Sequence, residues 1–575
     1  MAKIQPRNAF SKYTLGGFGG IGSPSPLSGL GASDMTNFRI RSDGTLVPRE
    51  GTRVLWDFGT TDEIRGFWEG TVQNEHLMLA VVGNQVHLLD LDTRASTVCA
   101  TLASSTGRVR FTAFKDMLYL LDGTEILLWS ADTQSFASFE PYAPLYGYMW
   151  EPRAMGEVNE PLNLLSAHVR IHYLNSSAST IFYLPFYAQK VDSVRSPDQR
   201  IDGFVFIPGS NVITIPDAAN CTTLTISMTL NVDQTAQSRI LAAQNAHVYN
   251  RNEGETMILY GTRGDWRAYC SSEVSEQDLA TCRMDYPDCM PVYFRDDDIL
   301  FLGDSEHPVT AISPHYDALL AFNSAQTWLL RPGEESVIEA YALINDTGAV
   351  SADAVTMCKE APALVTNGGV YLIRSSSTRP DVLTYKSLTA SLDIDLLRGM
   401  LKNPLLYRNV SCDELWLSAP NDPDGSVLVY SAEREEWYRF TGISASFFAD
   451  SPMGTVYASG SRLILFDRDC ATDCGEPFQC TYVSNYCDFG APESTRRSVR
   501  ASVTAYLDGG NATLSVVTDR GTKHFLLKGT PEQSDAPEHF DFRIHTGRHR
   551  FLQFALSLPA TQRVSLCKAG FYANR

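Results

Sequence analysis

The chain has 575 residues, of which 44% are hydrophobic and 20% charged, and its formal net charge at pH 7 is −19. This composition excludes an intrinsically disordered chain, and the length predicts two to four domains, because single hydrophobic cores stop growing well below this size. The acidic balance argues against a general nucleic-acid binder, since neutralising phosphates requires clustered Lys and Arg.

The beginning of the chain lacks the apolar core of a signal peptide, and no run of 18 apolar residues occurs anywhere. We therefore expect a protein that is made in a cytosol and does not insert into membranes. In that setting the twelve cysteines are predicted to be mostly reduced rather than paired in disulfides.

Residues 1–58 are predicted to form an extended arm followed by a hairpin. Residues 11–33 are too rich in Gly, Ser and Pro for a regular element, and residues 37–53 predict one hairpin that turns at Asp43 and Gly44. Such an arm cannot form a core of its own. It must lie along another part of the chain or along a neighbouring subunit.

Residues 59–150 predict the first two members of a series of short β-meanders. Apolar strands alternate with tight turns, at 83–84 in the unit 76–93 and at 122–123 in the unit 111–133. The theme resumes in residues 308–477, where four further units are predicted at 316–334, 363–377, 413–440 and 454–469. A meander cannot bury both of its faces alone, so we expect about six of them to stack into a six-bladed β-propeller.

Residues 151–307 interrupt the meanders and are predicted to form an inserted β domain. Alternating strands occur at 179–187 and 223–232. Its aromatic residues Tyr183, Tyr187 and Trp266 allow an alternative function, the binding of a surface glycan. Each is more often a core or strand-face aromatic than a sugar platform.

Residues 478–575 alternate apolar and polar positions around a turn at Gly509 and Gly510, which predicts a C-terminal β-sandwich. Although the whole chain is acidic, several arginines are clustered in residues 478–575. These side chains are either solvated strand faces or a contact with an acidic neighbour or with DNA. The residues of this basic patch are Arg496, Arg497, Arg500, Arg543, Arg548 and Arg550.

The sequence holds no convincing catalytic motif. Neither a nucleophile elbow nor a P-loop occurs, and the run Asp296-Asp297-Asp298 with Glu306 favours a solvated loop over a metal site or glycosidase pair, because consecutive carboxylates on an extended chain point in different directions. We therefore expect a protein that is not an enzyme and needs no cofactor.

A cysteine cluster offers one metal hypothesis. Four thiolates could hold zinc in a tetrahedron, but the spacing C-x3-C-x5-C-x6-C lacks the paired C-x2-C knuckles of zinc sites, which favours free cysteines. The four residues are Cys470, Cys474, Cys480 and Cys487.

The arm carries a loose motif, a Gly pair, then Asn-Phe, then G-x-L-x-x-R-x-G. In this respect it resembles the amino-terminal segment of bacteriophage tail nozzle, or tail tubular, proteins. The residues that match are Gly16, Gly17, Asn37, Phe38, Arg49 and Gly51.

The resemblance implies a structural virion protein, assembled in the host cytoplasm and located in the tail. It implies a homo-oligomeric ring, commonly a hexamer, that surrounds the DNA exit channel and joins a portal-side adaptor to distal tail parts, with tail fibres as further partners. Two alternatives remain open: a carbohydrate- or receptor-binding propeller of the tail, and a propeller glycosidase.

Overall fold

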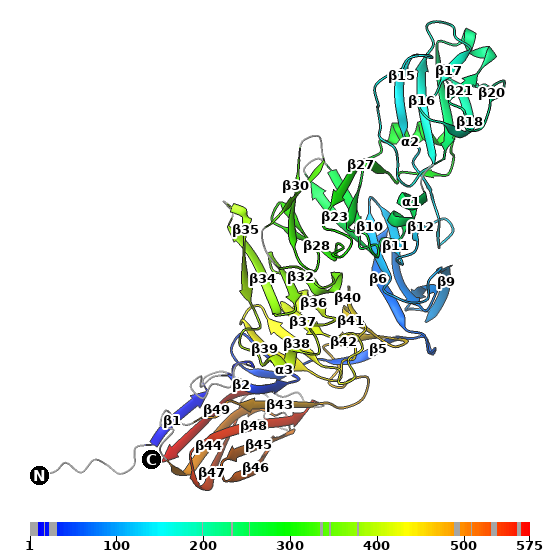
Figure 1. Cartoon of the computed structure of the whole chain (residues 1–575). Helices are drawn as coiled ribbons and strands as arrows, with labels where there is room; N and C mark the ends of the chain where they lie inside the picture. The colour runs from blue at the N-terminus through cyan, green and yellow to red at the C-terminus, as the bar shows by residue number, and fades with distance from the viewer. Residues whose placement is uncertain are drawn as a thin grey trace, which may run out of the picture. The chain divides into compact units, whose positions relative to one another are not determined.

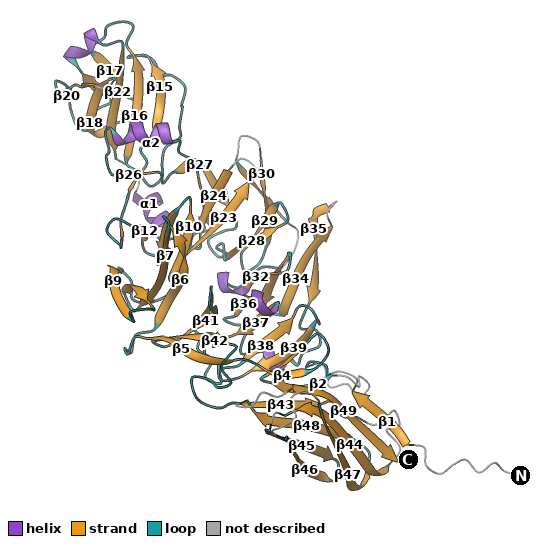
Figure 2. Cartoon of the chain, turned by 180° about the vertical axis from the view of Figure 1, so that it is seen from behind, coloured by secondary structure: helices purple, strands orange, loops and turns teal. Residues whose placement is uncertain are grey.

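Antiparallel β-strands dominate the structure, a computed structural model, and only short helices lie between them (Figure 1; Figure 2). The structure describes residues 10–15, 18–21, 31–197, 199–231, 234–251, 254–333, 337–343, 347–376, 379–487, 495–507, 509–530, 537–560 and 565–574. The chain divides into two compact units, Arg65–Gly348 and the combined segments Met1–Ile64 and Ala349–Arg575. The all-β class predicted from the sequence is confirmed.

Four antiparallel four-stranded meanders build most of the unit Arg65–Gly348. They are β6 (Ile64–Val72) to β9 (Ala95–Thr101), with β7 (Glu75–Val82) and β8 (Gln85–Asp90); β10 (Arg110–Phe114), β11 (Met117–Leu121), β12 (Ile126–Ser130) and β13 (Ser135–Ala137); β23 (Asn245–Arg251), β24 (Gly254–Tyr260), β25 (Arg267–Ser271) and β27 (Phe294–Phe301); and β28 (Ala311–His315), β29 (Ala318–Phe322), β30 (Thr327–Pro332) and β31 (Ile338–Ala342).

Successive meanders in this unit share their hydrophobic cores. On β11, Leu118 and Leu120 belong to the core with β7, whereas Tyr119 and Leu121 belong to the core with β24 and β25. Successive side chains of a strand point to opposite faces, so a strand packed on both faces is apolar at every position. This explains why the inner strands read as unbroken hydrophobic runs.

The third of these meanders lies within residues 151–307, which the sequence predicts to be an inserted β domain. Its strands β25 and β27 are separated by helix α2 (Glu276–Arg283) and by β26 (Cys289–Met290). This interruption hides the regular turn spacing on which sequence prediction depends. With this sheet the described residues form seven four-stranded meanders, where the sequence predicted six.

A separate core occupies residues 145–230 of the same unit. A five-stranded sheet and a three-stranded sheet enclose it, and β14 (Glu140–Pro141) pairs in parallel with β26 beside it. The elements are β15 (Leu145–Trp150), β16 (His168–Leu174), β18 (Ala188–Ser196), β19 (Gln199–Arg200) and β22 (Thr223–Leu230); β17 (Ile181–Tyr183), β20 (Val205–Phe206) and β21 (Val212–Thr214); the 3-10 helix η1 (Pro216–Asn220); and, after it, helix α1 (Gln234–Leu241).

The other unit contains three meanders. The first two are β32 (Val355–Cys358), β33 (Ala361–Thr366), β34 (Gly369–Ser376) and β35 (Arg379–Ser387); and β36 (Leu405–Asn409), β37 (Glu414–Ser418), β38 (Val427–Ser431) and β39 (Glu436–Phe440). The third is β40 (Phe447–Ser451), β41 (Gly454–Ser459) and β42 (Arg462–Asp467) with β5 (Gly51–Asp57). Short helices connect them: η3 (Ala352–Ala354), α3 (Ile394–Leu397) and η4 (Val410–Cys412).

Two strands of the amino-terminal segment complete sheets formed by the distant end of the chain. Strand β5 pairs antiparallel with β42 and so supplies the fourth strand of the last meander. Strand β2 (Ala32–Thr36) lies between β39 and β43 (Gln479–Ser484), parallel to the first and antiparallel to the second. The arm therefore joins the second meander of this unit to the C-terminal domain in one continuous sheet.

The C-terminal domain is a sandwich of two antiparallel sheets. In β45 (Asn511–Thr518) the side chains of Ala512, Leu514 and Val516 are buried and those between them are less so, which is the period of two expected for a strand packed on one face. One sheet contains β3 (Phe38–Ile40), β4 (Leu46–Pro48), β49 (Ser565–Asn574), β44 (Arg496–Tyr506) and β47 (Glu538–His549), with β1 (Phe10–Leu15) paired to β49; the other contains β43, β48 (Leu552–Pro559), β45 (Asn511–Thr518) and β46 (Gly521–Lys528).

Candidate functional site

Arg49 is the centre of a buried polar junction between the arm and the rest of its unit. Its guanidinium donates to both carboxylate oxygens of Asp473, at 2.9 and 2.5 Å. It also donates to the Asn37 side-chain oxygen (3.0 Å) and to the backbone oxygens of Thr441 (3.1 Å) and Glu50 (2.8 Å). The guanidinium is thus paired and hydrogen-bonded on every side, as a buried charge requires.

Two aromatic rings lie close to the Arg49 guanidinium. The Arg49 guanidinium carbon lies 3.9 Å from the centroid of the Phe478 ring and 5.6 Å from that of Phe440. Both distances are within the range of a cation–π contact. The arrangement depends on a planar guanidinium, which Lys does not provide.

Asn37 connects the arm to two other strands. Its φ of 59° is in the left-handed region, which Asn tolerates better than most residues. Its side-chain amide donates to the Thr441 hydroxyl (2.9 Å) and to the backbone oxygen of Gln479 (2.8 Å), and its side-chain oxygen accepts from the Thr441 backbone N–H (2.9 Å). A buried Asn with all these partners fixes the register of the arm.

Phe38 and Gly51 complete the described part of the motif. Phe38 is fully buried in the large core of this unit. A Cβ atom on Gly51 would lie 2.2 Å from the backbone oxygen of Thr472 and 2.8 Å from that of Cys470, so only glycine fits. The two other arm residues of the motif, Gly16 and Gly17, lie outside the described residues.

A second buried ion pair lies one strand away. Arg39 donates to both carboxylate oxygens of Glu414, at 2.8 and 3.1 Å, and also pairs with Glu50. Burial lowers the pKa of Arg39, but the charge of Glu414, its hydrogen bond and the nearby Cys412 and Tyr438 together outweigh burial, so the pKa is raised. Glu414 also accepts from the Trp416 indole N–H and the Tyr438 hydroxyl.

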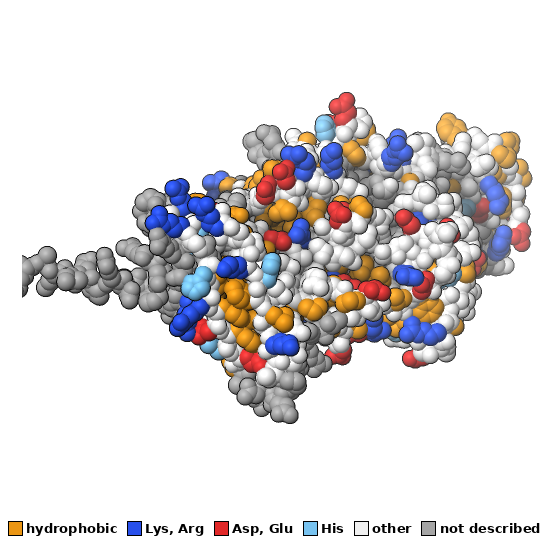
Figure 3. All heavy atoms as spheres, turned by 90° about the horizontal axis from the view of Figure 1, so that it is seen from below, with side chains coloured by type: hydrophobic (Ala, Val, Ile, Leu, Met, Phe, Trp, Pro, Cys, Tyr) orange, Lys and Arg blue, Asp and Glu red, His pale blue; other side chains and the backbone are white. Residues whose placement is uncertain are grey.

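The basic patch predicted in the C-terminal sandwich lies on β44 and β47, which pair antiparallel, and on Arg550 just after β47. Arg500 is directly opposite Arg543, and Arg496 is opposite His549. Arg500 forms an ion pair with Asp541. Arg543, Arg548 and Arg550 are exposed, and Lys and Arg side chains gather on part of the face in Figure 3. For Arg496 and Arg497 only the backbone on β44 is described.

The four clustered cysteines have different surroundings. Cys480 is buried and its thiol donates to the backbone oxygen of Asn37 (3.2 Å), whereas Cys474 is exposed with its sulfur 3.7 Å from the Thr52 hydroxyl. Cys487 is buried beside β48, and the Cys470 backbone oxygen accepts from Gly51. Within the described residues no group of three or more His, Cys, Asp or Glu side chains is placed to hold a metal ion.

The aromatics considered for glycan binding do not form one platform. Tyr183 and Tyr187 are 48% and 72% exposed, and Trp266 is half-buried, with the guanidinium of Arg267 5.9 Å from its ring. Tyr187 lines an open hollow of about 650 Å³ together with Phe186, Gln189 and Asn231.

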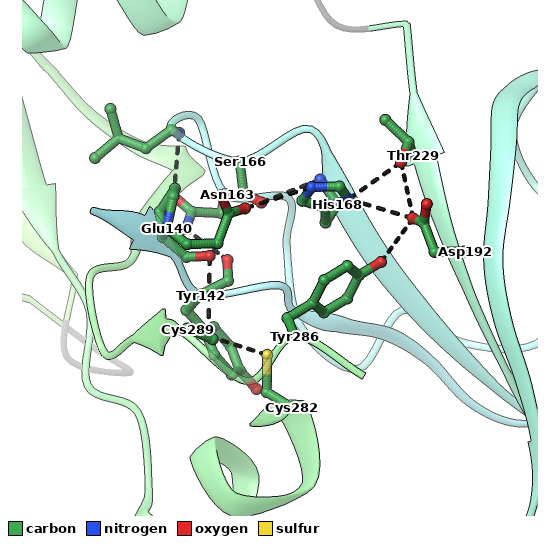
Figure 4. A network of polar contacts seen from close by, with 12 residues as sticks. Glu140, Tyr142, Asn163, Ser166, His168, Asp192, Thr229, Cys282, Tyr286 and Cys289 are labelled. Atoms are coloured by element: carbon green, nitrogen blue, oxygen red, sulfur yellow. Dashed lines mark hydrogen bonds and ion pairs between the residues drawn. The ribbon is translucent and has the colours of Figure 1, made fainter. Parts of the chain in front are cut away.

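A polar network in the unit Arg65–Gly348 was not found from the sequence (Figure 4). Asp192 accepts from the Tyr286 hydroxyl (2.9 Å) and the Thr229 hydroxyl (2.8 Å), and His168 Nδ1 lies 3.3 Å from the same carboxylate oxygen. Burial raises the pKa of Asp192, but hydrogen bonds, that with His168 first, lower it to about 2.

Two further thiols lie beside that network. Cys282 Sγ is 3.1 Å from Cys289 Sγ, and both are buried together with Tyr142 and Tyr293. A nearby carboxylate, Asp285, accepts from the side chains of residues on β18 and β22. These contacts fasten the segment after α2 to the five-stranded sheet. No local sequence motif predicts the contacts of Asp285, because it and its partners are 58 or more positions apart.

Comparison with known proteins identifies no family: no family model and no curated protein matches the chain. A chain in the crystal structure of the mitotic checkpoint complex is 11% identical, with a TM-score of 0.35, and the match covers 73% of this chain and 92% of that chain. The AfRom2 CNH domain is 8% identical, with a TM-score of 0.36, covering 72% and 99%. At these TM-scores the likeness carries no argument about fold or function.

Among the described residues, no helix has the length and apolar character needed to cross a membrane.

Proposed function

We propose that the chain is a structural subunit of a bacteriophage tail, a ring-forming nozzle protein that surrounds the DNA exit channel. The observation that carries the proposal is the buried junction of the arm. Asn37, Phe38, Arg49 and Gly51, the described residues behind the resemblance, each occupy a position that another side chain could not fill without loss of contacts. A structural subunit that carries load needs its arm held firmly, and these residues hold the arm against both the meanders of its unit and the C-terminal sandwich.

The proposed architecture is a β-propeller of seven blades rather than six. Seven successive meanders support it, as does the last sheet, in which β5 from the amino-terminal segment pairs with β42. Supplying the last blade with a strand from the opposite end of the chain is an effective way to close a ring, because opening the ring then requires breaking a sheet.

In this proposal the chain performs no catalysis and needs no cofactor. Its partners are copies of itself in a ring, most commonly six, an adaptor on the portal side, tail fibres outside, and the double-stranded DNA that passes through. The protein is assembled in the host cytoplasm and resides in the virion tail.

The test is the oligomeric state of the purified full chain, measured by native mass spectrometry and negative-stain imaging, alone and with phage particles that lack this protein. We expect rings with a central channel, either in solution or only on the particles. A chain that stays monomeric and does not attach to the particles would contradict the proposal.

The hollow beside Tyr187 favours one second candidate, a glycan-binding function of the inserted domain. An exposed aromatic ring next to the amides of Gln189 and Asn231 offers a stacking face and hydrogen-bonding groups for a sugar. Binding on a glycan array that is lost in Tyr187→Ala and retained in Tyr316→Ala, which removes another exposed tyrosine elsewhere, would support it. Equal binding by both variants would reject it.

A further inference from the structure

The charge of the chain is distributed unequally between its C-terminal domain and the rest. Residues 478–575 contain twelve Lys and Arg against eight Asp and Glu, a formal charge of +4. Since the whole chain carries −19, residues 1–477 carry −23. One chain therefore offers both a basic and a strongly acidic surface.

The positive charge is concentrated along one side of the sandwich, where β46 and β47, the last strands of the two sheets, lie next to each other. We name this surface the basic edge. Two acidic side chains, Asp519 and Asp541, lie among its basic residues, and Asp541 already pairs with Arg500. The basic residues are Arg500, Arg520, Lys523, Arg543, Arg548 and Arg550.

Three guanidinium groups of the basic edge are available to a partner. Arg543, Arg548 and Arg550 are exposed, and no carboxylate of the described residues forms an ion pair with them. Elsewhere in the described chain many arginines are paired with Asp or Glu, from Arg39 to Arg462. A cluster of exposed, unpaired arginines on an acidic protein indicates that the compensating charge comes from another molecule.

Exposed apolar side chains occur on the same elements as these basic residues. Leu526 on β46 is 57% exposed, and Phe551, next to Arg550, is 37% exposed. Hydrophobic and basic side chains are adjacent on the face in Figure 3. Arginine together with exposed apolar and aromatic residues is typical of a protein interface, whereas a duplex DNA contact is dominated by charged and polar groups.

Strand addition at this edge is obstructed by its own side chains. Lys523 donates to the backbone oxygen of His545, and Arg520 donates to that of Arg548 (3.1 Å). Both acceptors are on β47, so two positions of this strand edge are already occupied. A partner therefore binds through side chains rather than by extending the sheet.

We propose that the basic edge docks on the acidic surface of residues 1–477 of a second copy of this chain. The inference rests on the proposed ring. A ring is built from heterologous contacts, in which one surface of each subunit meets a different surface of the next. Complementary charges on the two surfaces of identical chains give such a contact its direction and discourage the symmetric pairing of two basic or two acidic faces.

The test compares two variants of the full chain with the same change of charge. The first carries Arg543→Glu, Arg548→Glu and Arg550→Glu on the basic edge. The control carries Arg153→Glu, Arg263→Glu and Lys402→Glu at exposed positions within residues 1–477, where added negative charge should not weaken the docking of a basic surface. Circular dichroism and thermal unfolding confirm that both fold, and a milder set with Gln in place of Glu is used if the first does not.

Self-association is measured by sedimentation velocity and native mass spectrometry at 50 and 500 mM NaCl, with anisotropy of a labelled 20-base-pair DNA duplex in parallel. We expect the apparent dissociation constant of self-association to rise at least about tenfold in the basic-edge variant and less than about threefold in the control. Wild-type association should weaken at high salt.

The outcomes separate this inference from the proposed function. A basic-edge variant that forms rings as well as the wild type overturns the inference but leaves the ring intact. Loss of DNA binding with unchanged ring formation also overturns it, and assigns the surface to DNA. A wild-type chain that remains monomeric at both salt concentrations and on particles contradicts both proposals.

Discussion

Arg49 and Asp473 are 424 positions apart in the chain and form a two-bond ion pair in which the arginine side chain is 0% exposed and the aspartate side chain 18%. The pair holds the arm to the segment between the last meander and the C-terminal sandwich. Its geometry leads to the first prediction.

Replacing Arg49 by Met should lower the free energy of unfolding by about 3–5 kcal/mol, because the Asp473 carboxylate loses its compensating charge and the Asn37 amide oxygen loses one of its two donors. Urea unfolding of the purified chain measures the effect. The control is Arg53→Met, which removes a partly exposed pair with Asp467 and should cost less than about 1 kcal/mol. Equal losses in the two variants would show that the buried junction contributes no more than a surface pair.

Gly51→Ala should also destabilise the junction, by about 1–3 kcal/mol, because the added Cβ meets rigid backbone atoms of Cys470 and Thr472 at 2.2 to 2.8 Å. The matched control is Gly399→Ala, where no atom lies within 4 Å of the added Cβ. We expect this control to change stability by less than about 1 kcal/mol. Thermal unfolding of the two variants side by side decides whether the close approach at Gly51 is required.

Acid should destabilise the unit Arg65–Gly348 through His247 on β23. Burial lowers the pKa of this imidazole from 6.5 to about 4, so the folded chain holds it neutral while the unfolded chain takes up a proton below pH 6.5. Its contribution to stability is therefore complete above about pH 6.5, declines as the pH falls, and is fully lost below about pH 4. The decline amounts to at most roughly 3 kcal/mol.

Urea unfolding of the wild type, His247→Gln and the exposed control His524→Gln at pH 7.5, 5.5 and 4.5 measures this contribution. The stability of His247→Gln should depend less steeply on pH than that of the wild type. Burial also lowers the pKa values of His87 and His172, so some dependence remains. Parallel pH profiles for all three proteins would show that His247 is not the group responsible.

Asp285→Asn should loosen the segment after α2 from the five-stranded sheet. The carboxylate accepts from the hydroxyls of Ser193 (2.6 Å) and Ser227 (2.7 Å) and pairs with Arg195, and it is almost fully buried. Removing its charge leaves the Arg195 guanidinium uncompensated, at a cost of roughly 3 kcal/mol.

Hydrogen exchange of β18 and β22 reports this local loosening directly. Exchange should accelerate in Asp285→Asn and remain as in the wild type in Asp202→Asn, which affects an exposed pair with Arg200. Unchanged exchange in Asp285→Asn would mean that packing alone holds the segment.

Features encoded in neighbouring residues were predictable. The turn at Asp122 and Gly123, for example, is made by the Asp122 carboxylate accepting from the backbone N–H groups of Thr124 and Glu125, and Gly123 has a φ of 82°. Such hydrogen bonds join residues two or three positions apart, so the residue types alone predict them. The same holds for the period-two strands of the C-terminal sandwich.

Features that depend on distant residues were not predictable. The meander at 245–301 lies within the predicted inserted domain, and the insertion of α2 and β26 between its last two strands obscures its regular turn spacing. Asp473, the partner of Arg49, and Asp285, the anchor after α2, have no distinctive neighbours in the sequence. Their roles come from burial and from which strands the fold brings against them.

The sequence by itself determined that this protein is built from short antiparallel strands. Asn37, Phe38, Arg49 and Gly51 were singled out only by the resemblance to tail nozzle proteins. Only the tertiary structure decided what they do: an arm strand enters a sheet between β39 and β43, and a buried arginine meets an aspartate hundreds of positions away. The physical reason is the distance along the chain over which each interaction acts. Strand period and turn chemistry act over a few residues, whereas the pairing of buried charges depends on distances in space that the order of residues does not record.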